Sequence, residues 1–73
     1  MARLPFSNDI PTLRFLAGEM TQAELGERVG VTRQTIAAIE QGKYSPSLEV
    51  AFRIARTFGK PLEQVFGWDE EGR

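Results

Sequence analysis

Two helix start signals on either side of a glycine are the feature that most constrains how this chain can fold. Thr21 followed by Glu24 is a capping box, in which each side chain accepts a hydrogen bond from the other residue's backbone amide. Gly30 stands where the left-handed residue that ends such a helix is expected, and Thr32 can cap the next helix. Residues 21 to 40 therefore predict two short helices joined by a tight turn.

Pro11 and Gly18 bound another helix on the N-terminal side of this pair. Proline suits the first turn of a helix and disfavours helix at the residue before it. We therefore expect a helix from Pro11 to Ala17, preceded by an N-terminal arm over residues 1–10.

Two more helices are expected after the pair. Ser47 can cap a fourth helix that ends at Gly59 and has an apolar stripe formed by Leu48, Ala51, Ile54, Ala55 and Phe58. Pro61 begins a short fifth helix through Phe66. No window alternates apolar and polar residues for long enough to predict a strand. The sequence thus predicts an all-α fold of five helices over residues 11–66, with residues 67–73 as an acidic C-terminal tail.

Cysteine and histidine are both absent from the 73 residues. Their absence excludes disulfides and thiolate metal sites, and it removes the commonest general base and metal ligand. No spacing of the remaining Ser, Thr, Lys, Asp and Glu residues assembles a base beside a nucleophile. We therefore expect a single domain that needs no metal or cofactor and is not an enzyme.

The distribution of apolar and charged residues bears on location and partners. The apolar runs are far shorter than the roughly 20 residues of a membrane-spanning helix, so we expect a cytoplasmic protein without membrane contact. The net charge of −1 is uneven, because Asp69, Glu70 and Glu71 stand together near the end of the chain. The remainder is net positive and is compatible with a polyanionic partner.

The predicted helix pair has a shape suited to DNA. Two helices that cross at a short turn form a helix-turn-helix, and the second helix can lie in the major groove. Arg33 and Gln34 directly follow the Thr32 cap. Arginine can donate two hydrogen bonds to guanine, and glutamine can pair with adenine. Without the surrounding motif, both would be interpreted as ordinary solvated residues.

These residues resemble the helix-turn-helix domains of the phage lambda repressor and Cro type. The resemblance runs from Leu13 to Phe66, and its most specific pieces are residues 21–25, 29–36, 39–43 and 46–48. The chain is similar to a compact subfamily of stand-alone bacterial and archaeal regulators. The resemblance implies a five-helix domain with the helix-turn-helix at the second and third helices.

The resemblance also implies roles for individual residues. Positions that face bases are matched by Arg33, Gln34 and Ala37. Positions that contact the DNA backbone are matched by Gln22, Thr35, Lys43, Tyr44 and Ser45. Arg14 and Glu40 match an ion pair that joins the first and third helices. One departure from the family is Gly26, which stands where most relatives have an alanine at the helix crossing.

The large aromatic side chains are too many for a core of this size. They are Phe6, Phe15, Phe52 and Trp68. Two interpretations stay open: the rings complete a core and its covered flank, or some of them form a homodimer interface. For the second interpretation we select Val65, Phe66 and Trp68, because repressors of this class bind paired half-sites.

Together, these features lead us to expect a sequence-specific regulator that binds double-stranded DNA and represses transcription by occupying a promoter. The main alternative is a protein-interaction module, such as an antitoxin or adaptor, that retains the same fold. The exposed start of the third helix has no purpose in that alternative.

Overall fold

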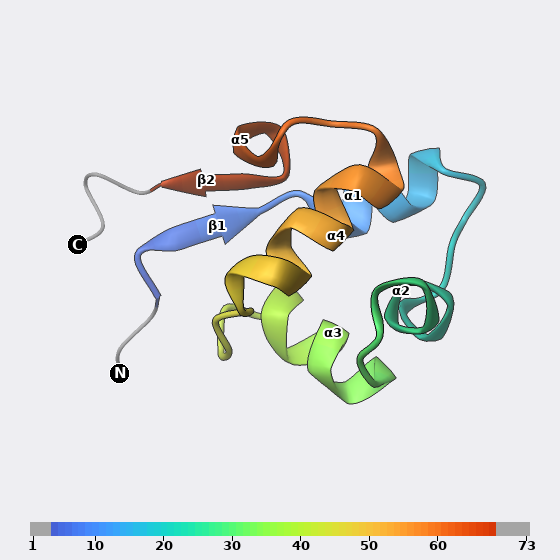
Figure 1. Cartoon of the computed structure of the whole chain (residues 1–73), viewed down its shortest axis with the longest axis horizontal. Helices are drawn as coiled ribbons and strands as arrows, with labels where there is room; N and C mark the ends of the chain where they lie inside the picture. The colour runs from blue at the N-terminus through green and yellow to red at the C-terminus, as the bar shows by residue number, and fades with distance from the viewer. Residues whose placement is uncertain (1–3, 69–73) are drawn as a thin grey trace.

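The computed structural model describes residues 4–68, which form five helices and two short strands (Figure 1). In chain order the elements are β1 (Phe6–Asn8), α1 (Ile10–Leu16), α2 (Gln22–Val29), α3 (Arg33–Glu40), α4 (Leu48–Phe58), α5 (Leu62–Val65) and β2 (Phe66–Trp68). The predicted five-helix architecture is confirmed. The predicted acidic residues 69–71 lie outside the described residues.

The helix boundaries follow from the local signals in the sequence. Both hydrogen bonds of the capping box are present, with the Glu24 amide donating to Thr21 Oγ1 at 3.0 Å and the Thr21 amide donating to Glu24 Oε1 at 2.8 Å. Gly30 ends α2 with φ at 86°, and Thr32 caps α3 by accepting from the Thr35 amide at 3.1 Å. Each of these bonds spans few residues, which is why the sequence predicts them.

The helices enclose a small core of aliphatic side chains. Its fully buried members are Ile10, Leu25, Ile36, Ile39, Ile54 and Val65. They come from all five helices, and α4 packs against α2 and α5. Ile36 and Ile39 fix which face of α3 points inward, so the opposite face of that helix points away from the core.

A two-stranded antiparallel sheet corrects the prediction that the fold has no strand. Phe6 pairs with Trp68, Ser7 with Gly67 and Asn8 with Phe66. In Figure 1 the two strands lie side by side at one end of the molecule. Strands of three residues are too short to show an alternating pattern, and their partners lie at opposite ends of the chain. The domain boundaries at residues 10 and 67 stay predictions, but the expected arm and tail each contribute a strand.

Asn8 connects this sheet to two helices. Its side-chain oxygen accepts from the Ile10 amide at 3.0 Å, and its amide nitrogen donates to the Ile39 and Glu40 carbonyl oxygens at 3.2 and 3.4 Å. The first bond lets α1 begin at Ile10, one residue before the predicted start. The other two reach carbonyl groups in the last turn of α3, where the Ile39 oxygen also accepts from the Gly42 amide at 3.0 Å.

Candidate nucleic-acid interface

The crossing of α2 and α3 leaves no room for a side chain at Gly26. The Gly30 and Val31 amides both donate to the Gly26 carbonyl oxygen, at 2.8 and 2.9 Å. A Cβ atom on Gly26 would lie 2.6 Å from the Val31 carbonyl oxygen. The backbone of the turn therefore packs directly on α2. This contact fixes the direction in which α3 leaves the turn.

The surface of α3 opposite the core contains the residues expected to face bases. Arg33 and Gln34 are exposed, and Ala37 is half-buried. The two long side chains stand at the N-terminal end of α3, one after the other. They are thus accessible to a partner, as base-reading side chains must be.

Two residues of the same helix surface were not predicted from the sequence. With 3.6 residues per turn, Ala38 and Gln41 project on the side of α3 opposite Ile36 and Ile39. Gln41 is exposed and Ala38 is half-buried. The helical period that marks the two isoleucines as core could have identified both residues.

The loop after α3 contains three residues that we expected to contact the DNA backbone. Lys43, Tyr44 and Ser45 are all exposed. The Lys43 amide donates to the Ala38 carbonyl oxygen at 2.9 Å, which holds the start of the loop against the last turn of α3. Within residues 4–68, neither Lys43 nor Arg33 takes part in an ion pair. Both cations are therefore available to an anionic partner.

The N-terminal end of α3 also contains a threonine pair. The Thr35 side chain is half-buried, and its hydroxyl lies 3.0 Å from that of Thr32. The pair orders the start of α3 beside Arg33 and Gln34. The hydroxyl that donates within the pair can accept a further hydrogen bond, and the hydroxyl that accepts can still donate its own hydrogen.

Arg14 and Glu40 form an ion pair that joins α1 to α3. Arg14 Nε lies 2.7 Å from Glu40 Oε2, and a second guanidinium nitrogen donates to Oε1 at 3.1 Å. The third nitrogen donates to the Met20 carbonyl oxygen at 2.8 Å. The two side chains are only 18% and 8% exposed. A two-point contact at this degree of burial holds the C-terminal end of α3 in a defined position.

Gln22 belongs to the same network, which the sequence did not predict. Its amide nitrogen donates to Glu40 Oε1 at 3.0 Å, so the first residue of α2 is tied to the last residue of α3. A glutamine amide has two N–H donors. The bond to Glu40 uses one of them and leaves the other, at the N-terminal end of α2, for an external acceptor.

The three residues selected for a homodimer interface lie in different surroundings. Val65 is 1% exposed and belongs to the core, so it cannot contact a partner, and its selection was wrong. Phe66 is half-buried and packs edge-on against Phe6, with ring centroids 6.1 Å apart. Trp68 is 67% exposed. Val65 is the buried residue of α5, so its side chain packs this short helix against the aliphatic core.

Neither a metal site nor a membrane span is found in the part of the chain that the structure describes. Residues 4–68 contain no group of three or more acidic side chains placed to hold an ion. No helix among them is both long and apolar enough to cross a bilayer.

Two helices crossed over a glycine turn, with the start of the second exposed, define a helix-turn-helix protein. Residues 14–65 match the family model described as helix-turn-helix, and the chain belongs to this family of transcriptional regulators.

Curated relatives and a solved structure agree with this assignment. An HTH-type transcriptional regulator of Methanothermobacter thermautotrophicus is 61% identical over 54 residues, which cover 73% of this chain and 78% of the relative. The HTH-type transcriptional regulator YgzD of Bacillus subtilis is 50% identical over 64 residues, or 88% of this chain and 96% of YgzD. The phage CTXphi transcriptional repressor RstR of Vibrio cholerae is 33% identical, over 82% of this chain and 53% of RstR. A crystal structure of a Bacteroides fragilis protein has a similar fold, with a TM-score of 0.72, 22% identity, and coverage of 85% of this chain and 98% of that one.

Proposed function

We propose that this protein binds double-stranded DNA in a sequence-specific manner, with α3 in the major groove, and represses transcription in the cytoplasm by occupying a promoter. The exposed start of α3 carries this proposal. Arg33 and Gln34 stand there side by side, on a helix whose other face is fixed in the core. Their side chains have the donors and acceptors that recognise guanine and adenine in the major groove.

Side chains that can bind phosphate lie on two sides of the α3 surface that contains Arg33 and Gln34. The second amide N–H of Gln22 stands at the start of α2, and Lys43, Tyr44 and Ser45 follow α3. Contacts of this kind set the register of a protein on DNA without reading its sequence. In this proposal they position Arg33, Gln34 and Ala37 over the base edges, while Thr35 contributes a hydroxyl to the backbone contacts.

Repression by occupancy is supported by one relative. RstR of Vibrio cholerae is named as a transcriptional repressor. We further propose that this protein binds as a homodimer to paired half-sites about 34 Å apart.

The test is to select duplexes from a random DNA pool and to titrate the selected duplex by fluorescence anisotropy. We expect Arg33→Ala to weaken binding by about 1 to 3 kcal/mol and to relax the preference at one base pair. Arg56→Ala is the matched control, because Arg56 is an exposed arginine on α4 and its loss changes the net charge equally. It should leave the selected sequence unchanged.

Failure to select any sequence would contradict this proposal. Equal affinities of the Arg33→Ala and Arg56→Ala variants for the selected duplex would also contradict the role of Arg33. In either case the alternative of a protein-interaction module, such as an antitoxin or adaptor, would be favoured.

A further inference from the structure

Glu40 receives hydrogen bonds from two other helices through one carboxylate. Its Oε2 atom accepts from Arg14 Nε at 2.7 Å. Its Oε1 atom accepts from a second Arg14 nitrogen at 3.1 Å and from the Gln22 amide nitrogen at 3.0 Å. The Glu40 side chain is only 8% exposed, so it offers little surface to a DNA molecule. Any influence of Glu40 on DNA binding must therefore pass through the groups that it holds.

The carboxylate determines which end of the Gln22 amide faces inward. A glutamine amide has a nitrogen that donates and an oxygen that accepts, and a half-turn about its last bond exchanges them. An ionised carboxylate accepts hydrogen bonds only, so only the nitrogen end can face Glu40. One N–H of Gln22 then points to Glu40, and the other points away from it at the N-terminal end of α2. Phosphate oxygen atoms are acceptors too, so this orientation offers them a donor.

Arg14 fixes the backbone at the start of α2 as well. A third guanidinium nitrogen donates to the Met20 carbonyl oxygen at 2.8 Å, and the Met20 amide donates to the Arg14 carbonyl oxygen at 2.9 Å. Met20 is buried in the core and stands two residues before Gln22. The network thus holds Gln22 through its backbone and through its side chain. Arg14 also balances the charge of Glu40, which would otherwise repel a nearby phosphate.

We propose that Glu40 is a positioning residue for DNA binding, which orients the Gln22 amide so that its second N–H donates to a phosphate of the DNA backbone. This inference rests on the proposed function and adds to it a residue that does not touch the DNA. It predicts an effect opposite in sign to that of charge alone. Removing a negative charge from a protein strengthens its attraction to DNA. Removing the charge of Glu40 should instead weaken binding, because the oriented donor is lost.

Glu40→Gln separates these two effects, because it keeps the size of the side chain and changes its hydrogen bonding. Arg14 Nε makes the shorter bond and retains the one remaining oxygen. The new amide nitrogen then faces Gln22, so two donors oppose each other and the Gln22 amide turns over. Glu49→Gln is the matched control. Glu49 also lies 2.7 Å from an arginine nitrogen, but it is 72% exposed on α4.

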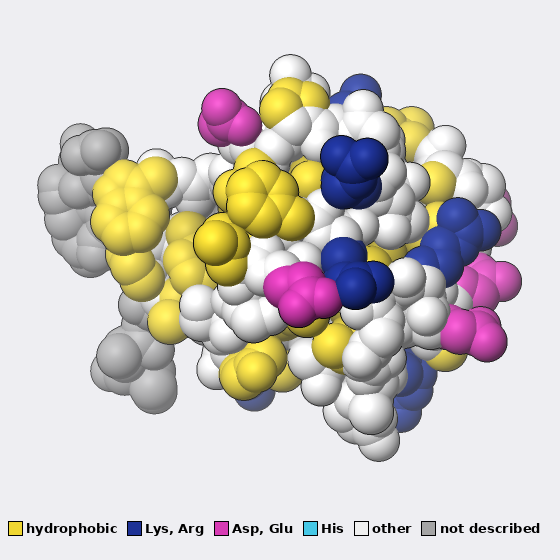
Figure 2. Space-filling view, in the orientation of Figure 1, with side chains coloured by type: hydrophobic (Ala, Val, Ile, Leu, Met, Phe, Trp, Pro, Cys, Tyr) yellow, Lys and Arg dark blue, Asp and Glu magenta, His cyan; other side chains and the backbone are white. Residues whose placement is uncertain are grey.

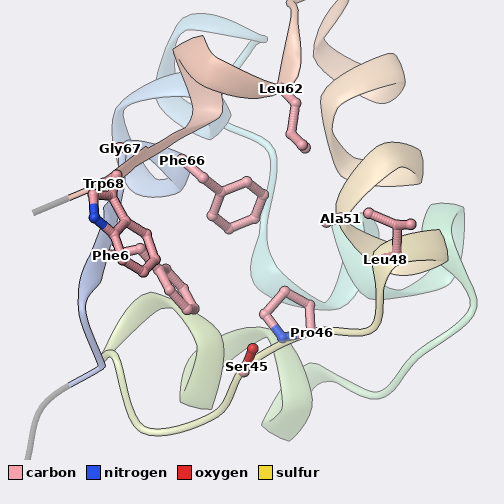
Figure 3. Close-up of a pocket in the computed structure, with 9 residues that line it drawn as sticks. All are labelled: Phe6, Ser45, Pro46, Leu48, Ala51, Leu62, Phe66, Gly67 and Trp68. Carbon is pink, nitrogen blue, oxygen red and sulfur yellow. The ribbon is translucent and has the colours of Figure 1, made fainter.

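An apolar groove between the sheet and the start of α4 is a separate feature of the surface. It has a volume of about 400 Å³, and its main lining residues are Phe6, Pro46, Leu48, Leu62, Phe66 and Trp68 (Figure 3). In Figure 2 hydrophobic side chains gather over the same end of the molecule. Gln22, Glu40 and Glu49 do not line this groove. A difference in DNA binding between their variants therefore does not come from it.

Nuclear magnetic resonance of the protein without DNA tests the orientation of the amide. The side-chain signals of Gln22 are assigned as those that disappear in Gln22→Ala. We expect one Gln22 proton to lie at higher frequency than those of the exposed glutamines, because it is bonded to a carboxylate. These exposed glutamines are Gln34, Gln41 and Gln64. Glu40→Gln should remove this shift and Glu49→Gln should retain it, while the backbone signals report whether each variant is folded.

DNA binding is then measured by fluorescence anisotropy with the selected duplex. We expect Gln22→Ala and Glu40→Gln each to weaken binding by about ten-fold, as the loss of one hydrogen bond to a charged group does. The double variant should bind no more weakly than Gln22→Ala, because both substitutions remove the same contact. If Glu40 only stabilised the fold, the two losses would multiply. Glu49→Gln should bind at least as tightly as the wild type.

A scan of the DNA backbone locates the contact. Each duplex of the scan has one phosphate replaced by a neutral methylphosphonate. The position that weakens binding of the wild type but not of Gln22→Ala identifies the phosphate that Gln22 contacts. Glu40→Gln should lose its sensitivity at the same position, whereas Lys43→Ala should keep it there. A purely structural role of Glu40 would leave the pattern of sensitive positions unchanged.

Several results would overturn the proposal. One is a wild-type spectrum in which no Gln22 proton is shifted, which requires no substitution at position 40. Others are losses that multiply in the double variant, an unchanged scan pattern in Glu40→Gln, and equal affinities of Glu40→Gln and Glu49→Gln. In each of these cases the selected duplex still supports the proposed function. If no duplex is selected, the proposed function fails and this inference fails with it.

Discussion

The Val31 carbonyl oxygen lies 2.6 Å from the position that a Cβ atom would occupy on Gly26. This distance is too short for a carbon–oxygen contact, so any side chain at position 26 must push the turn away from α2. From the sequence, Gly26 was only a departure from the alanine that the family resemblance implies at the helix crossing. The structure brings the turn so close to α2 that an alanine does not fit at position 26 without a shift.

Gly26→Ala should therefore lower stability, although alanine is the better helix former. Overpacking costs about 1 to 3 kcal/mol, and replacing a helical glycine by alanine recovers about 1 kcal/mol. We expect a net loss of about 1 kcal/mol, measured as the free energy of unfolding in urea. Ala23→Gly, at an exposed position of α2, calibrates the helix-propensity part alone. A higher stability of Gly26→Ala would contradict the contact with Val31.

The ion pair of Glu40 should contribute far more to stability than that of Glu49. Both pairs have an N–O distance of 2.7 Å, but Glu40 is 8% exposed and Glu49 is 72% exposed. Glu40→Ala leaves the Arg14 guanidinium without its partner at a largely buried site, and we expect a loss of about 3 kcal/mol. Glu49→Ala should cost less than about 1 kcal/mol, because solvent screens its contact with Arg53.

A second variant keeps this comparison informative if Glu40→Ala does not fold. Glu40→Gln retains one oxygen that can accept from Arg14, but it removes the charge and replaces the other acceptor oxygen by an amide nitrogen. Its unfolding free energy should lie between those of the wild type and Glu40→Ala. Equal losses for Glu40→Ala and Glu49→Ala in urea denaturation would show that burial does not decide the strength of these pairs.

Asn8→Ala should destabilise the fold through the end of α3. The substitution removes the two bonds to the Ile39 and Glu40 carbonyl oxygens and the bond from the Ile10 amide. The Ile39 carbonyl oxygen keeps its bond from the Gly42 amide. The Glu40 carbonyl oxygen and the Ile10 amide lose the partner that Asn8 supplies, and leaving partly buried polar groups without partners costs about 1 to 3 kcal/mol. The neighbouring Ser7→Ala is the control, because Ser7 is exposed on the same strand. Thermal unfolding of both variants tests the difference, and similar melting temperatures would argue against the role of Asn8.

Lys43→Ala should reduce the salt dependence of DNA binding. In the proposed complex Lys43 neutralises one phosphate, so its removal should lower the slope of log K against log salt by about 1. The loss of affinity should be similar for the selected and for unrelated duplexes. Lys60→Ala, an exposed lysine just after α4, changes the net charge equally and should leave the slope as it is. An unchanged slope in Lys43→Ala would exclude this phosphate contact.

The sequence determined the elements whose causes are local. Thr21, Thr32 and Ser47 cap helices through bonds to amides three residues further along the chain, and the structure contains each of these bonds. The period of Ile36 and Ile39 assigned the inner face of α3, and with it the exposed positions of Arg33 and Gln34. Signals of this kind are visible in a sequence because the interacting groups are close along the chain.

The tertiary structure alone decided the contacts between distant segments. The pairing of residues 6–8 with 66–68, the bonds from Asn8 to the end of α3, and the link from Gln22 to Glu40 have no local signal. The burial of Val65 has no local signal either. We selected this residue from the sequence for an interface, and the fold buries it in the core. Such contacts depend on how the helices pack together, and packing is a property of side chains that meet only in the folded chain.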